Sequence, residues 1–180
     1  MGYFDNVSAA KVSKSGQYYL PGEYKVRVEA CKVVPSTQKN GVIYFIVETT
    51  CLESDNPDIK EGGAYSQTIN MNQIMGMPNI KLFVAAATGI DPFMEDKRNE
   101  LNDAIEKTWS ALLERPMTVE AVCSFIASSA NPLEGVELGL TCVNTRTRPV
   151  PGKPEGGDFT KHQWFPLQDA AADAGISAAG

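Results

Sequence analysis

Apolar and polar positions divide this chain of 180 residues into six patterned segments. Five of them alternate with a period of two or are apolar at most positions, as β-strands are, and one has the 3.6-residue period of a helix. The strand-like segments are residues 22–35, 41–52, 63–72, 117–128 and 135–147, and the helix-like segment is residues 79–88. The pattern therefore predicts three strands, a helix and two further strands.

Individual segments refine this prediction. In residues 22–35, Tyr24, Val26 and Val28 alternate with polar residues, which is typical of a strand with one buried and one exposed face. Residues 42–50 are apolar on both parities, so we expect a central strand that is covered on both sides. The alternation of Val119 with its neighbours predicts a fourth strand at residues 118–127, and that of Leu138 and Leu140 predicts a fifth.

Helix signals are clear between the third and fourth predicted strands. Pro78–Asn79 opens the helix at 79–88, and Gly89 supplies its C-cap. Asp91–Pro92 then starts a second helix, because an N-cap residue is followed by proline at the first helical position. This acidic helical insertion spans residues 91–116.

The order of the segments indicates a fold. Three strands, a helix and two strands match the oligonucleotide/oligosaccharide-binding (OB) barrel, a five-stranded Greek-key fold that binds single-stranded nucleic acid. We therefore predict a mainly β (α+β) chain with an OB-type barrel domain at residues 21–168. An N-terminal arm at 1–20 precedes it, and a flexible C-terminal tail at 169–180 follows it.

Charge is distributed unevenly along the chain. The net charge is −6, which at first argues against a nucleic-acid partner. Residues 1–90 are neutral, residues 91–137 carry the whole deficit, and the segment from residue 138 to 168 is net basic. An acidic chain can still present a basic groove, because affinity depends on local potential. No apolar run is long enough for a transmembrane helix, and the N-terminus lacks a secretory signal.

Several sequence segments resemble one group of proteins. The segments are LPGEYKVRVEACK, GVIYFIVETTCLESDNP, GGAYSQTIN, MPNIKLFVAAATGIDP and a closing F-x-K-H-x-W-x-P. Over residues 20–167 the chain is similar to bacteriophage proteins described as single-stranded DNA-binding or as uncharacterised. The resemblance implies an OB fold, binding of single-stranded DNA in replication or recombination, and a location in the host cytoplasm. It also admits self-association and contacts with phage replication proteins.

The tail departs from a related pattern. Bacterial single-strand-binding proteins end in an acidic, phenylalanine-terminated tip that recruits partners. Here the tail is DAAADAGISAAG, with two aspartates and no terminal aromatic residue. We therefore do not expect recruitment through such a tip.

Binding of single strands needs aromatic rings that stack on bases and cations that follow the phosphates. On an OB barrel the site is the outer face of strands two and three with two flanking loops. The candidate rings and cations are Tyr44, Tyr65, Trp164, Lys25, Arg27, Lys39, Arg146, Arg148, Lys153 and Lys161. For two of these rings an alternative to stacking remains open. Tyr44 could lie at the edge of the core, and Trp164 could pin the last segment onto the barrel.

The residue types and their spacing give little support for catalysis or metal binding. His162 is the only histidine, so a Ser or Cys nucleophile has no evident base, and the four cysteines lack C-x-x-C spacing. The acidic loop from Glu53 to Glu61 misses the spacing of a calcium loop. We expect no enzyme activity, cofactor or metal. The alternative function is a virion-associated structural protein that uses a small β-barrel for protein contacts.

Overall fold

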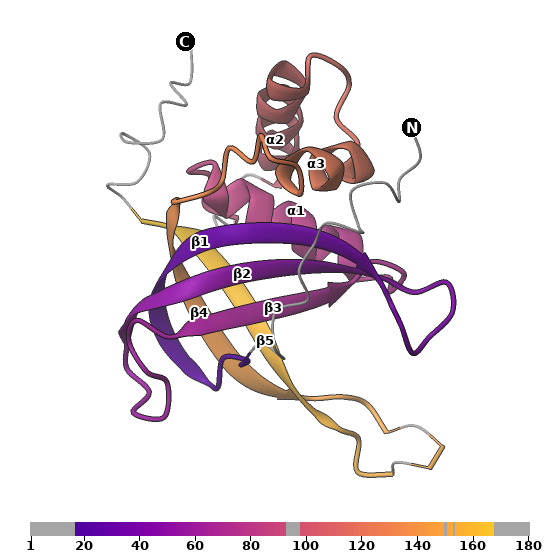
Figure 1. Cartoon of the computed structure of the whole chain (residues 1–180). Coiled ribbons are helices and arrows are strands. Elements are labelled where there is room, and N and C mark those ends of the chain that lie inside the picture. The colour runs from indigo at the N-terminus through magenta and orange to yellow at the C-terminus, as the bar shows by residue number, and fades with distance from the viewer. Residues whose placement is uncertain (1–16, 93–97, 150, 153, 168–180) are drawn as a thin grey trace.

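The chain folds mainly into β-structure, in a computed structural model that describes residues 17–92, 98–149, 151–152 and 154–167. Five antiparallel strands form one open, curled sheet, and helices gather on one side of it (Figure 1). The elements are β1 (Gly22–Pro35), β2 (Ile43–Ser54), β3 (Ala64–Asn70), α1 (Gly76–Ala87), α2 (Arg98–Leu113), α3 (Val119–Ile126), β4 (Glu137–Arg146) and β5 (Asp158–Pro166).

The sheet has a Greek-key order. Its strands lie in the order β3-β2-β1-β4-β5. β1, β2 and β3 are joined consecutively, and β4 returns after the helices to pair with the other side of β1, which is the defining connection of a Greek key. β3 and β5 are therefore the two edges of the open sheet.

The structure differs from the prediction in two segments: the expected fourth strand is a helix, and the strand β5 was not expected. Residues 118–127 were expected to form the fourth strand, but α3 occupies them. Thr118 caps this helix, because its Oγ1 accepts a hydrogen bond from the Ala121 N–H at 3.1 Å. Val122 and Ile126 are buried on one helical face. The expected fifth strand is β4, and the actual fifth strand, β5, lies in the segment that followed it. The helices predicted at 79–88 and 91–116 correspond to α1 and α2.

β1 bends where its register shifts. The shifts lie between Lys25 and Val26 and between Val28 and Ala30 on the pairing with β2. Such irregularities increase the local twist and bend of a strand. The N-terminal part of β1, Gly22–Arg27, pairs with β4, while β1 pairs with β2 over most of its length. The bend thus lets one strand serve both halves of the curled sheet.

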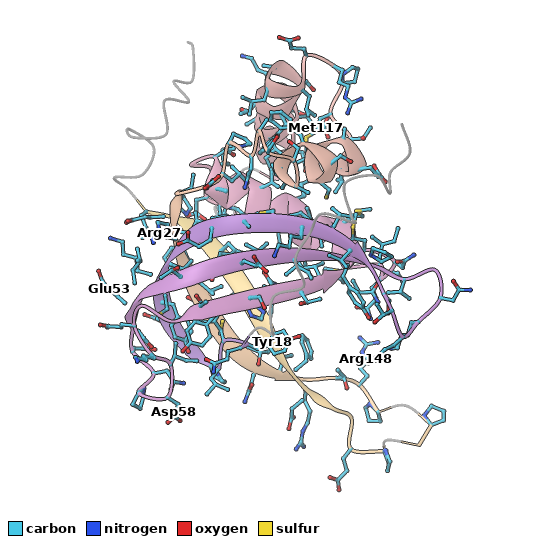
Figure 2. All side chains as sticks on the ribbon, viewed as in Figure 1. Tyr18, Arg27, Glu53, Asp58, Met117 and Arg148 are labelled. Atoms are coloured by element: carbon cyan, nitrogen blue, oxygen red, sulfur yellow. The ribbon has the colours of Figure 1, made fainter. Side chains whose placement is uncertain are left out.

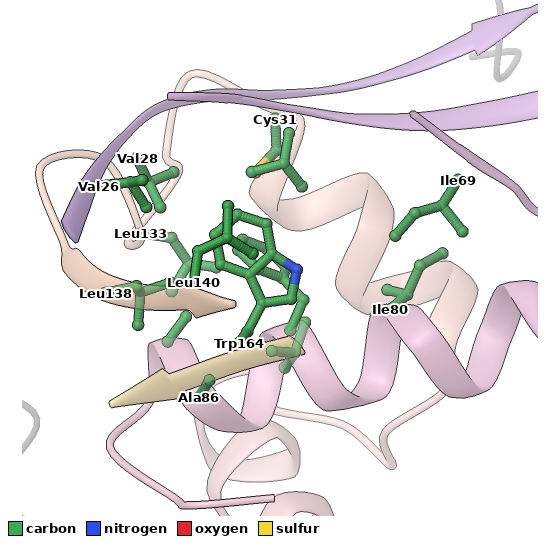
Figure 3. Packing of buried hydrophobic residues seen from close by; sticks show 14 of the residues in the cluster. Val26, Val28, Cys31, Ile69, Ile80, Ala86, Leu133, Leu138, Leu140 and Trp164 are labelled. Carbon is green, nitrogen blue, oxygen red and sulfur yellow. The ribbon is translucent and has the colours of Figure 1, made fainter. Parts of the chain in front are cut away.

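Trp164 lies at the centre of the core (Figure 3). Its ring is edge-on to Phe83 of α1, with centroids 5.2 Å apart, and Phe83 in turn faces Phe45 of β2 at 6.2 Å. The indole Nε1 donates a hydrogen bond to Oε1 of Gln67 at 2.8 Å. Because Trp164 is on β5 and Gln67 is on β3, this bond joins the two edge strands inside the core.

The segment before β1 belongs to the packed structure. The Ser66 N–H on β3 donates to the Gln17 carbonyl at 2.9 Å. Tyr19 is 1% exposed, its hydroxyl lies 2.8 Å from Oγ1 of Thr49, and its ring centroid is 4.8 Å from that of Tyr65. The folded unit therefore includes residues 17–20, which were expected to belong to the arm. The rest of the arm and the whole tail, residues 169–180, lie outside the described residues.

Helices α2 and α3 pack together beyond α1. Ile105 and Trp109 of α2 are buried, and Ser110 Oγ accepts a hydrogen bond from the Met117 N–H at 2.9 Å. In the described part of the chain, no helix is both long and apolar enough to cross a membrane.

Candidate nucleic-acid interface

The outer face of β1 carries cations that are already paired. Lys25 and Arg27 point outward, as predicted, but each meets a carboxylate, and a neighbouring lysine does the same. The ion pairs are Lys25–Glu137 at 2.9 Å, Arg27–Glu29 at 2.9 Å and Lys32–Glu48 at 2.7 Å. Each carboxylate offsets the potential of its cation, so this face offers little net attraction for phosphate.

Two of the predicted stacking rings are buried. Tyr65 is 4% exposed, and its hydroxyl accepts a hydrogen bond from the Lys60 N–H at 2.8 Å. Trp164 is 2% exposed and holds the edge strands together. Both residues lie on the inward parity of their strands, so their rings pack in the core instead of facing a ligand. Trp164 therefore anchors the last strand in the core, which was the alternative to a stacking role.

β2 is fully covered on one face only, contrary to the expectation for residues 42–50, and Tyr44 has the outward position expected of a stacking ring. The opposite parity of β2 is core, with Phe45 and Val47 fully buried, while Tyr44 remains half-buried on the outer face. Tyr44 pairs with Asn70 of β3 on one side and with Val34 of β1 on the other. It is therefore next to the loop that joins β1 and β2.

Two segments form the surface around Tyr44, which we call the Tyr44 end: residues 36–44 and 70–76. Asn72 ties them together, because its Oδ1 accepts from the Ile43 N–H at 2.8 Å and its Nδ2 donates to the Gly41 carbonyl at 3.2 Å. Lys39 is exposed, and its N–H donates to Ser36 Oγ at 2.9 Å. Lys39 is the only charged residue in these two segments, so the Tyr44 end contains no carboxylate side chain.

The opposite end of β2 has the opposite charge. Glu53 lies at the end of β2, and the loop from β2 to β3 carries Asp55, Asp58 and Glu61 against Lys60. Figure 2 shows Glu53 and Asp58 on one side of the molecule and Arg148 on the other. The acidic loop and the Tyr44 end, which has one lysine and no carboxylate, therefore lie at opposite ends of β2.

The β4–β5 hairpin forms a projecting arm, residues 143–161, because the pairing of β4 with β1 stops at Cys142. Arg148 and Lys161 are exposed on this arm. Arg146 is also exposed and lies 3.5 Å from Asp158, with both side chains more than 70% exposed. Lys153 lies outside the described residues. Figure 1 shows the arm and the β1–β2 loop projecting from the same side of the sheet.

The arm also presents a ring that the sequence analysis missed. Phe159 is 45% exposed and shares the outer face of β5 with Lys161, two residues along. The alternation in DFTKHQWF predicts this position of Phe159. When Trp164 points inward, the period of two places Phe159, Lys161 and Gln163 on the other face. Phe159 joins the candidate residues for that reason.

The titratable core groups are unsuited to nucleophilic chemistry. Burial raises the pKa of the thiols of Cys31, Cys123 and Cys142 to about 12, so they stay protonated at neutral pH. Burial lowers the pKa of His162 to about 4, and its Nε2 has no hydrogen-bond partner among the described residues. These groups behave as neutral packing residues.

Two comparisons with known proteins found no match. No protein-family model matches the chain, and no curated protein sequence is significantly similar to it. The features that bear on function are therefore the placement of Tyr44, the cations around it and the Greek-key sheet.

Proposed function

We propose that this chain is a non-catalytic single-stranded DNA-binding protein of a bacteriophage, which coats strands during replication or recombination. The observation that carries the proposal is that Tyr44 lies beside the β1–β2 loop. This loop carries Lys39 and projects from the same side of the sheet as the β4–β5 arm (Figure 1). A ring with nearby cations suits a strand of bases and phosphates.

The topology supports an OB-type barrel in this proposal. An OB fold is a five-stranded, partly open Greek-key barrel that binds its ligands on strands two and three and on the loops between strands one and two and between strands four and five. Here those elements are the Tyr44 end and the β4–β5 arm. The Trp164–Gln67 bond across the open edge fits a sheet that curls toward closure.

The proposed mechanism divides the work between charge and stacking. Lys39, Arg148 and Lys161 contact phosphates, and Tyr44 stacks on a base. Each phosphate contact contributes a slope of roughly −0.7 to the dependence of log Kobs on log salt for a single strand. Three contacts therefore give a slope of about −2. Loss of a stacking ring typically costs about 1–3 kcal/mol per base.

Fluorescence anisotropy of a labelled oligo-dT, titrated at several salt concentrations, tests the proposal. We expect Lys39→Ala to reduce the salt slope by about 0.7. Lys60→Ala removes the same charge at the acidic end and should leave the slope unchanged. Tyr44→Ala should weaken binding at all salt concentrations, whereas Tyr44→Phe keeps the ring and should bind normally. Absence of binding at low salt would refute the function.

One observation favours the alternative, a virion-associated structural protein. The paired charges on the outer face of β1 suit a complementary protein surface better than a phosphate backbone. This alternative predicts that the protein is found in purified phage particles and that oligo-dT does not bind it at low salt.

A further inference from the structure

The turn between β3 and α1 exposes two large apolar side chains. Ile74 is 95% exposed and Met75 is 59% exposed, which makes Ile74 the most exposed large hydrophobic residue of the described chain. A single exposed apolar residue is ordinary. Two adjacent ones that project from the surface suggest a contact with another molecule.

The backbone of this turn is fixed by hydrogen bonds. The Asn72 N–H donates to the Asn70 Oδ1 at 2.9 Å, the Gln73 N–H to the Asn70 carbonyl at 3.3 Å, and the Gly76 N–H to the Gln73 carbonyl at 2.9 Å. A Cβ at Gly76 would overlap the Asn70 carbonyl, so the turn is packed tightly against the end of β3. The exposure of Ile74 is therefore set by a defined turn.

The turn adjoins the proposed DNA-binding surface. Asn70, where the turn begins, pairs with Tyr44 across β2 and β3. Asn72 of the turn bonds to Gly41 and Ile43, at the end of the loop that carries Lys39. An apolar pair, an outward ring and a single cation thus lie in the two segments of the Tyr44 end, which contain no carboxylate side chain.

We infer that Ile74 and Met75 form a wedge that inserts between successive unpaired bases beside the base on Tyr44. This inference rests on the proposed function. Apolar side chains such as Ile and Met can separate neighbouring bases by replacing base–base stacking with their own contacts. The protein would then unstack the strand that it binds, and it would destabilise hairpins in that strand.

Charge and continuity favour bases over a protein partner as the occupant. The wedge directly continues the surface around Tyr44, and Lys39 places a counter-charge where the adjoining phosphate would pass. The two segments that form this end contain one lysine and no acidic side chain, so their own charge attracts a nucleic acid.

An oligonucleotide containing 2-aminopurine between adenines tests the wedge, because its fluorescence rises when the base is unstacked. At saturating wild-type protein we expect emission to increase at least two-fold. The double variant Ile74→Ser/Met75→Ser should lose more than half of this increase while keeping the salt slope of binding. Tyr18→Ser/Leu20→Ser changes two other exposed apolar side chains and should retain the increase. Lys39→Ala should lower the salt slope but give the wild-type emission at saturation.

The outcomes separate this inference from the function beneath it. If the wild type binds and the Ile74→Ser/Met75→Ser variant gives the full emission increase, the wedge is overturned and DNA binding stands. If the variant loses self-association in sedimentation velocity but keeps the emission increase, the turn contacts protein and the wedge is again overturned. If the wild type binds no oligonucleotide at low salt, the proposed function fails and the wedge fails with it. Circular dichroism of each variant verifies that the fold is retained.

Discussion

The hydrogen bond between Gln67 and Trp164 provides a sharp test of how the sheet is held. The bond is 2.8 Å long, and its residues are 8% and 2% exposed. Gln67→Met removes the acceptor with a side chain of similar size and leaves the indole N–H buried without a partner. Leaving such a group unsatisfied costs about 1–3 kcal/mol. We therefore expect the free energy of unfolding to fall by about 2 kcal/mol.

Urea unfolding followed by far-UV circular dichroism measures this loss. The m-value should stay unchanged. A destabilisation of about 2 kcal/mol corresponds to a decrease in Tm of roughly 4–8 °C for a chain of this size. Trp164→Phe should cost more, because it also removes part of a central ring. In the double variant the second change no longer leaves an unpaired polar group, so the combined loss should be smaller than the sum by about 1 kcal/mol.

A matched control is available on the surface. Gln38 is exposed in the β1–β2 loop, so Gln38→Met should change stability by no more than about 0.5 kcal/mol. The reasoning is wrong if Gln67→Met is as harmless as this control, or if the effects of the Gln67 and Trp164 substitutions simply add.

Three further predictions concern other parts of the fold. Burial lowers the pKa of His162 to about 4, so the stability that its neutral form confers is present above pH 6.5 and is lost as the pH falls toward 4. His162→Gln should make the urea midpoint less dependent on pH over that range, and an unchanged pH profile would contradict this. Gly139→Ala should destabilise by about 1–3 kcal/mol, because the added Cβ overlaps the Phe165 ring, and Phe165→Leu should restore part of the loss in the double variant. Thr118→Ala should cost about 1 kcal/mol in thermal unfolding by removing the cap of α3, whereas Thr118→Ser should cost little; equal losses would exclude the cap as the cause.

Local patterns predicted the first half of the fold well. The expected segments at 22–35, 41–52, 63–72 and 79–88 correspond to β1, β2, β3 and α1. The prediction of a strand at residues 118–127 was wrong. In so short a segment, Val119, Cys123 and their neighbours fit a period of two and a helical period equally well. Thr118 as an N-cap, with Glu120 in the first turn, was the local signal that favoured a helix.

The fifth strand was missed because its neighbourhood is rich in proline and glycine. The alternation in residues 158–166 is regular, but the preceding turn formers obscured it. Once β5 is recognised, its order in the sheet follows from pairing with β4.

The candidate site was only partly predictable. The outward position of Tyr44 was expected although residues 42–50 are apolar on both parities, because Phe45 and Val47 are the stronger candidates for the core. The same alternation in β5 identifies Phe159. The pairing of Lys25 with Glu137 depends on contact between distant strands, which the sequence alone does not show. The ion pair Arg27–Glu29 could have been predicted from the sequence, since residues two apart on a strand share a face.

Both ends of the described chain hold β3, and this affects the order of folding. Gln17 bonds to the β3 backbone, and Trp164 bonds to the Gln67 side chain. A nascent chain that contains only β1, β2 and β3 lacks the strand and the tryptophan that complete its interior. Contacts between residues far apart in sequence form slowly. We therefore expect the sheet to acquire its stability late in synthesis, when the last strand reaches the third.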